Sequence, residues 1–239
     1  MRLTILGMNG PFPAPGGATS GYLLDCGDTV LGLDLGSGTL SRLTALMPPE
    51  GLSALLLTHW HYDHCADVLP LLYRLEAMGA TLHIYAPADE QSPLRKAVQA
   101  CRAVVLHDLQ PGDSLCIGGT QISVFPARHP VPAVMLRIAH AGKTFCYTGD
   151  TNTMDGLTAF ADQADFLLAD GLFLEAAWTE GKPHLSATHV AKLAQDANVR
   201  RFVITHLNPA IDPVTLLREA RAVRIDALLA ACGDTYTIE

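Results

Sequence analysis

Residues 55–65 read LLLTHWHYDHC, an apolar run that leads directly into three histidines and one aspartate. The apolar part is typical of a buried strand. Imidazole and carboxylate groups are ligand types that suit zinc, manganese or iron, and four of them follow the run: His59, His61, Asp63 and His64. Side chains two residues apart point the same way on an extended chain, so His59 and His61 could share one ion. Asp63 and His64 begin the next turn and would face a second ion. A loop that is histidine-rich by chance is the weaker interpretation, because four such groups fall within six residues.

On either side of this segment the sequence alternates between strand-like and helix-like runs. Strands are predicted at 3–6, 22–25, 30–34, 54–58, 82–85, 114–117, 121–126, 134–139, 144–148, 166–169, 201–205 and 230–238. Helices are predicted at 67–78, 92–101, 154–161, 187–197 and 213–221, with Ser92 and Ser186 as N-caps. Residues 9–17, rich in Gly and Pro, are predicted to form a loop. Strands lead, helices follow and the pattern repeats once. We therefore expect an α/β fold with two sheets packed face to face and helices outside, as a single domain over residues 1–239.

The composition limits the classes of function. The chain is 49% hydrophobic, enough for a sizeable core, and its net charge of −8 makes nucleic acid an unlikely partner. A bound pair of divalent cations would still permit an anionic substrate at the site itself. The six cysteines contain no CxxC pair and are interpreted as reduced thiols of a cytoplasmic protein. No apolar run is long enough for a membrane span, and the first residues do not have the layout of a signal peptide.

The sequence resembles a known family over nearly its whole length. The stretch HWHYDH, residues 59–64, is the HxHxDH signature of the metallo-β-lactamase superfamily. The early stretch GYLLDCGDTVLGLDLGSGT is similar to the ribonuclease Z branch, and so are the later stretches ARHPVPAVMLRI, YTGDT and VITHLNP. The fold that this resemblance implies is an αββα sandwich of two mixed sheets flanked by helices.

The resemblance also implies a ligand set for two metal ions, which we expect to be zinc, with manganese as the alternative. One ion would be held by His59, His61 and His129, the other by Asp63, His64 and His206, and Asp150 would bridge the two. Asp63 is also expected to take part in catalysis. Physical chemistry supports a bridge, because a shared carboxylate reduces the repulsion between the ions and sets the spacing at which one water could bind both. The alternatives are a structural histidine before Pro130 and a turn aspartate at position 150.

A second group lies outside the ligand set. In the ribonuclease Z and cyclic phosphodiesterase branches, a histidine in a segment like KPHLSATHVAKLA contacts the scissile phosphate, which here implies His184. The stretch DFLLADGLF resembles the one that supplies its acidic partner, here Asp170. A carboxylate that orients an imidazole lets it stabilise charge or protonate a leaving oxygen. A surface histidine and a solvated aspartate are the alternatives. His83, His107, His140 and His189 are interpreted as structural, with His189 facing solvent.

These features favour a two-metal hydrolase of a small or cyclic phosphodiester. The lactamases of this fold that bind two metals usually have Cys where this chain has Asp150. The thioesterase glyoxalase II has basic residues near its end that have no match here. The tRNA-cleaving enzymes of the ribonuclease Z branch carry a long arm between the third histidine and the bridging aspartate, whereas only 20 residues separate His129 from Asp150. A tRNA 3′-processing enzyme, a thioester or lactone hydrolase and a non-catalytic metal-dependent binding protein remain alternatives. A homodimer is implied by resemblance alone.

Overall fold

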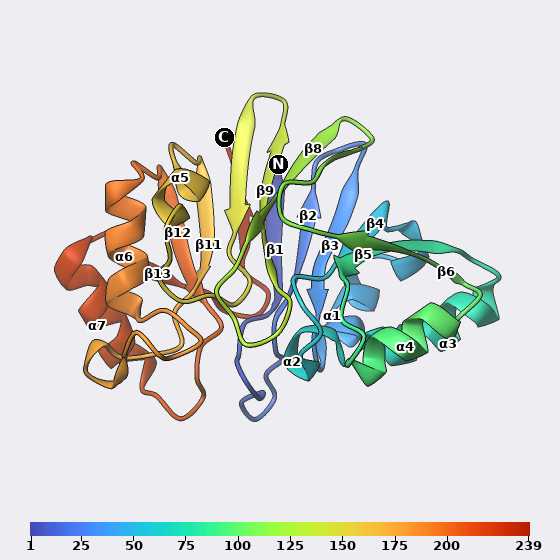
Figure 1. The fold of residues 1–239 in the computed structure, drawn as a ribbon, viewed down its shortest axis with the longest axis horizontal. Helices are drawn as coiled ribbons and strands as arrows, with labels where there is room; N and C mark the ends of the chain where they lie inside the picture. Colours follow the sequence, from blue (N-terminus) through green and yellow to red (C-terminus); the bar gives the residue numbers. More distant parts are fainter.

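Fourteen strands form two seven-stranded mixed sheets in a computed structural model that describes residues 1–239 (Figure 1). The first sheet has the order β14 (Thr235–Thr237), β1 (Arg2–Gly7), β2 (Gly21–Asp25), β3 (Val30–Leu35), β4 (Ala54–Leu56), β5 (Leu82–Pro87) and β6 (Val104–Leu109). The second has the order β13 (Leu228–Leu229), β12 (Arg201–Thr205), β11 (Phe166–Asp170), β10 (Lys143–Tyr147), β9 (Val134–His140), β8 (Thr120–Pro126) and β7 (Ser114–Ile117). In each sheet antiparallel pairing gives way to parallel pairing part-way across, from β3 to β6 and from β10 to β13.

Helices cover the outer face of each sheet, so the chain has the expected αββα sandwich. The helices of the first half are α1 (Thr39–Leu46), α2 (Tyr62–Cys65), α3 (Val68–Met78) and α4 (Pro93–Ala100), with a 3-10 turn at Pro49–Gly51. Those of the second half are α5 (Leu157–Ala161), α6 (Ala187–Asp196) and α7 (Pro213–Val223), with a 3-10 turn at Glu175–Ala177. The two sets lie at opposite sides of the sheets in Figure 1. No helix is long and apolar enough to cross a membrane.

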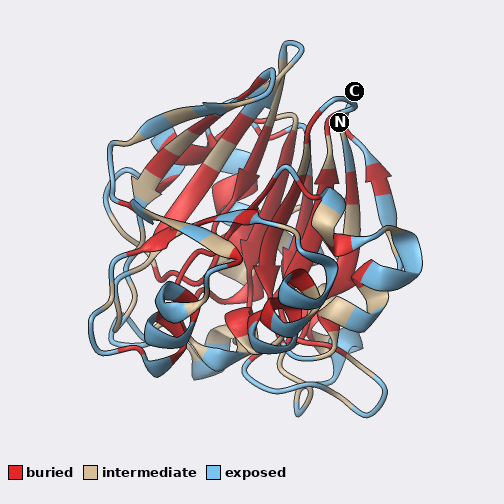
Figure 2. Cartoon of the chain, turned by 90° about the vertical axis from the view of Figure 1, so that its right-hand side faces the viewer, coloured by how far each residue is buried: buried red, intermediate tan, exposed pale blue.

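Three apolar layers hold the sandwich together. The middle layer contains side chains from both sheets, including Leu33, Leu136 and Phe145. The outer layers lie under the helices, around Leu71 in the first half and Phe202 in the second. Figure 2 shows the result, with buried strands at the centre and exposed helix faces outside. Burial of this kind stabilises the fold by roughly 25 cal/mol per Å² of apolar surface. The packed layers therefore hold the strands, and with them the strand ends, in fixed positions.

Most predicted elements are confirmed with ends shifted by a few residues, and Ser92 and Ser186 accept the expected cap hydrogen bonds. Four differences matter. The prediction missed α1, the short α2, strand β6 and strand β13, since the strand expected at 230–238 contains only β14. Helix α1 follows Gly38 without a side-chain cap, so it lacks the usual start signal. Strand β6 is a half-exposed edge strand without a clear alternation of buried and exposed residues.

Candidate metal centre

The sandwich brings all the predicted site residues to one edge, where strands of both sheets end. His59 and His61 follow β4, and Asp63 and His64 lie in α2. The other residues come from the second sheet: His129 follows β8, Asp150 follows β10, Asp170 ends β11, His184 precedes α6 and His206 follows β12. Side chains separated by up to about 150 residues therefore meet at this edge.

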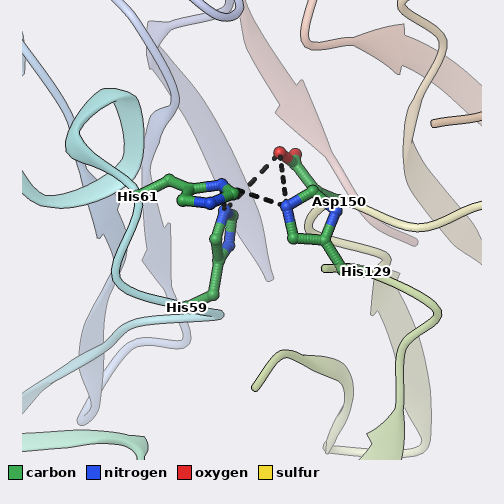
Figure 3. A group of neighbouring side chains, drawn as sticks. All are labelled: His59, His61, His129 and Asp150. Carbon is green, nitrogen blue, oxygen red and sulfur yellow. Dashed lines mark hydrogen bonds and ion pairs between the residues drawn. The ribbon is translucent and has the colours of Figure 1, made fainter. Parts of the chain in front are cut away.

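The first group consists of His59, His61, His129 and Asp150, whose ligand atoms all lie within 4.8 Å of one another (Figure 3). His61 Nδ1 lies 3.1 Å from His59 Nε2 and 3.0 Å from His129 Nε2. Asp150 Oδ2 lies 3.6 Å from His59 Nε2 and 3.9 Å from His129 Nε2. Atoms bound about 2.1 Å from a tetrahedral ion are about 3.4 Å apart, so these spacings suit one ion.

The second group consists of Asp63, His64, Asp150 and His206. Asp150 Oδ1 lies 3.1 Å from His64 Nε2 and 3.2 Å from His206 Nδ1. Asp63 Oδ2 lies 3.7 Å from the Nε2 atom of both histidines. Asp150 thus turns one carboxylate oxygen toward each group, as a bridging ligand would.

Three buried atoms show that the second group fits a cation. The atoms Asp150 Oδ1, His64 Nε2 and His206 Nε2 have no hydrogen-bond partner. A buried polar atom without a partner costs about 1–3 kcal/mol, unless a ligand satisfies it. Imidazole nitrogen and carboxylate oxygen are ligand types for zinc and similar divalent ions. Both groups are therefore suited to hold divalent metal.

The protonation of the histidines agrees with this interpretation. Burial lowers the pKa of His129 to about 4 and holds the pKa of His59 and His206 well below the usual range, so these imidazoles are neutral. Burial opposes charge on His64 too, but Asp150, Asp34 and Asp63 raise its pKa well above the usual range. Three carboxylates around one imidazole favour a positive charge at that point, which a metal ion would supply.

Two backbone positions in the left-handed region help to aim these groups. His206 has φ of 56° and Asp34 has φ of 53°, although neither is glycine. Such conformations cost about 1–3 kcal/mol and persist only where the surroundings enforce them. Directly before Asp150, Gly149 has φ of 52°, and a Cβ there would lie 2.7 Å from Thr58. Glycine is thus required at the turn that delivers Asp150.

Asp34, which the sequence did not predict as a site residue, orients His64 through its Nδ1 atom. This fully buried carboxylate at the end of β3 accepts from His64 Nδ1 at 2.8 Å and from the Tyr147 hydroxyl at 2.6 Å. Its other oxygen accepts from the Thr58 backbone N–H at 2.7 Å. A carboxylate on Nδ1 leaves Nε2 free for a metal. An aspartate within the apolar run VLGLDL was the available signal.

His184 and Asp170 form a pair directly beside the metal groups. His184 Nδ1 lies 2.7 Å from Asp170 Oδ2 and 3.8 Å from Asp150 Oδ2. Burial would lower the pKa of His184, but the Asp170 carboxylate raises it to about 9. Burial raises the pKa of Asp170 to about 6 against the opposing charge of His184. At neutral pH the pair is an imidazolium held by a carboxylate.

The remaining histidines lie away from this edge or outside the ligand groups. His83 and His107 contact each other at 2.8 Å across β5 and β6, and His140 contacts Thr120 at 3.1 Å. The expectation that His189 faces solvent is wrong, because its side chain is 18% exposed and packs on Trp178. Cys65 is fully buried, and Tyr62 is 63% exposed.

Comparison with known proteins agrees with the fold. Residues 22–207 match the family described as "Beta-lactamase superfamily domain". The chain belongs to the beta-lactamase superfamily. A superfamily relative, the "Probable metallo-hydrolase YhfI" of Bacillus subtilis, is 31% identical over 93% of both chains. A crystal structure of YhfI superposes with a TM-score of 0.92 at 30% identity over 98% of both chains.

Relatives named as ribonucleases are more distant. The "Ribonuclease Z" of Haloferax volcanii is 26% identical over 93% of this chain and 90% of its own length. The human short-form tRNase Z shares the superfamily fold with a TM-score of 0.82 at 20% identity, over 100% of both chains.

Proposed function

We propose that this chain is a metal-dependent hydrolase of small phosphodiesters, in which His184 acts on the substrate beside two divalent metal ions. The observation that carries the proposal is the His184–Asp170 pair, whose imidazole lies 3.8 Å from the Asp150 carboxylate. A charged imidazole outside the ligand groups is what charge stabilisation at a phosphoryl group needs.

The residues that would hold the ions are those of the two ligand groups. His59, His61 and His129 would bind one ion, Asp63, His64 and His206 the other, and Asp150 both. We expect zinc, because the set is rich in imidazole, with manganese as the alternative. When bound, such ions polarise phosphoryl oxygens and lower the pKa of a water nucleophile.

His184 would supply a proton and a positive charge at its Nε2 atom. Its Nδ1 atom is bonded to Asp170, and no protein group hydrogen-bonds Nε2. The imidazole ring lies 4.9 Å from that of His206 and 5.4 Å from that of His129, so it borders both ligand groups. From there it can stabilise the phosphoryl charge or protonate the leaving oxygen, while Asp170 fixes its orientation.

Three features support a small substrate. The segment between His129 and Asp150 is a simple β9–β10 hairpin with a two-residue turn, so nothing projects there as an arm. A cavity of about 230 Å³ borders His129 and is lined by Arg128, Lys182 and Pro183 among others. This volume is below the range of about 300–1,000 Å³ typical of drug-sized ligands. The net charge of −8 also disfavours a polyanion, whose affinity depends on many basic contacts.

The decisive experiment replaces His184 with Ala and measures turnover and metal content together. We expect turnover of an unactivated phosphodiester to fall roughly 10²–10⁴-fold, the usual contribution of one proton donor. The loss should be smaller for a nitrophenyl ester, whose leaving group needs no proton, and the metal content should stay unchanged. His140→Ala, at a half-exposed histidine of β9, is the matched control and should behave as wild type.

The substrate class is tested by a parallel screen of phosphodiesters, thioesters, lactones and precursor tRNA with the zinc-loaded protein. Turnover of small phosphodiesters alone supports the proposal. Efficient cleavage of precursor tRNA at physiological salt would overturn the size argument, and a preference for thioesters would overturn the phosphodiester assignment. Equal turnover by His184→Ala on the unactivated ester would remove His184 from the reaction.

A further inference from the structure

The loop of residues 178–184, between the 3-10 turn Glu175–Ala177 and helix α6, carries His184 and also contacts a metal-ligand histidine. His129 Nδ1 lies 3.3 Å from the Pro183 carbonyl oxygen in this loop. A carbonyl on Nδ1 fixes the orientation of an imidazole and directs Nε2 toward a metal. The position of one loop therefore sets two functional histidines, and whatever holds the loop matters for both.

We propose that Asn152 is the positioning residue that holds this loop in place for His184. Asn152 is fully buried and follows the bridging Asp150 by two residues. Its Nδ2 atom lies 2.6 Å from the carbonyl oxygen of Lys182 and 3.1 Å from that of Glu180. A third carbonyl oxygen, that of Thr179, lies 3.3 Å away. The amide has two N–H donors, so these carbonyls share them.

The other end of the Asn152 amide holds the start of the loop. Its Oδ1 atom accepts a hydrogen bond from the Trp178 indole Nε1 at 3.0 Å and from the Thr153 backbone N–H at 2.6 Å. The same indole N–H lies 3.1 Å from the His184 carbonyl oxygen. Trp178 thus connects the Asn152 amide to the backbone of the catalytic histidine itself.

The chemistry of this contact requires an amide. Aspartate has the same shape but no donors, so it would place negative charge against three carbonyl oxygens. Arg128 adds support from the cavity side, since its Nη2 atom donates to the Glu180 carbonyl at 3.0 Å, but its side chain is 45% exposed. Asn152 is the fully buried member of the arrangement and links the Asp150 turn to the His184 loop.

The first test observes the loop directly. The chain has two tryptophans, so the ¹H–¹⁵N spectrum of the zinc-loaded protein should contain two indole signals. Asn152→Asp and Asn152→Ala should shift or broaden the Trp178 signal. The Trp60 signal should stay in place, because that indole donates to the Pro87 carbonyl at 2.7 Å. An unchanged Trp178 signal in both variants would overturn the proposal.

The second test separates positioning from general destabilisation, and it rests on the proposed role of His184. At saturating zinc we expect Asn152→Ala to lower kcat about 10–100-fold on an unactivated phosphodiester, with KM little changed. In the His184→Ala background the same substitution should have almost no further effect, because residues that act through one another are not additive. Additive losses would refute a role through His184.

A matched control is Asp165→Ala at the opposite end of β11. Asp165 accepts from the Thr144 backbone N–H at 2.8 Å and pairs with Lys143, so its loss should destabilise the same sheet. It should leave kcat unchanged, and an equal loss of kcat would show that Asn152 acts only through stability. If His184→Ala turns over the unactivated phosphodiester as fast as wild type, the proposed function fails. The indole spectrum would still decide whether Asn152 holds the loop.

Discussion

Asp34→Asn is the sharpest test of how the second ligand group is built. Asparagine keeps the size of aspartate and tolerates the left-handed backbone, so φ of 53° at this position should remain accessible. The substitution places an N–H₂ group where Oδ2 now accepts from His64 Nδ1 and the Tyr147 hydroxyl. The other oxygen can keep its bond to the Thr58 backbone N–H.

The expected consequence is a change of tautomer. With a donor opposite Nδ1, neutral His64 must carry its proton on Nε2, the atom that faces Asp150 at 3.1 Å. A protonated Nε2 cannot bind a metal. Loss of such an orienting partner typically lowers metal affinity about 10–100-fold. That range corresponds to about 1.4–2.8 kcal/mol. If two zinc ions bind as proposed, only the ion held by Asp63, His64 and His206 should bind more weakly.

Competition with a chromophoric chelator would measure both affinities, and circular dichroism would verify the fold. Tyr147→Phe is the matched control, because it removes one donor to Asp34 but leaves the carboxylate and hence the His64 tautomer in place. We expect Tyr147→Phe to bind two equivalents nearly as tightly as wild type. Wild-type affinity at both sites in Asp34→Asn would refute the reasoning.

Three further predictions concern the metals and the thiols. Asp150→Ala should release at least one equivalent of metal, as seen by elemental analysis, because both groups lose a ligand. Each zinc ion, at about 100 times the Kd of its site, should stabilise the fold by about 2.7 kcal/mol, so calorimetry should show Tm rising by about 5–10 °C per occupied site for a chain of this size. Burial raises the pKa of the Cys146 thiol to about 12, so it stays protonated near neutral pH and should react with Ellman's reagent far more slowly than the exposed Cys116.

The sequence was most informative where a local pattern and a chemical type coincide. The apolar run before His59 predicts a buried strand that ends at the site, and RFVIT before His206 does the same in the second half. Side chains that cap a helix within three or four residues, such as Ser186, are predictable for the same reason. In these cases the partners are close in sequence.

Residues whose partners are distant in sequence could not be assigned this way. The Asp34 carboxylate meets Thr58, His64 and Tyr147, which lie 24, 30 and 113 residues away. Asn152 donates to carbonyl groups 27 to 30 residues further on. Every residue has a backbone carbonyl, so residue types do not indicate which carbonyls accept a hydrogen bond. Both residues support others rather than bind metal, so residue type alone does not distinguish them from turn residues.

The two halves of the fold each supply an incomplete site. His59 and His61 come from the first half of the fold, and His129 from the second half completes their ligand group. In the same way, His206 from the second half completes the group of Asp63 and His64. Asp150, from the second sheet, contacts both groups. An ion in either group would therefore bind across the interface between the sheets, and the metals would hold the two sheets together as well as act on substrate. This arrangement would explain why buried carboxylates are tolerated at the edge of an apolar sandwich, because cations bound there would stabilise the packing that brings the carboxylates together.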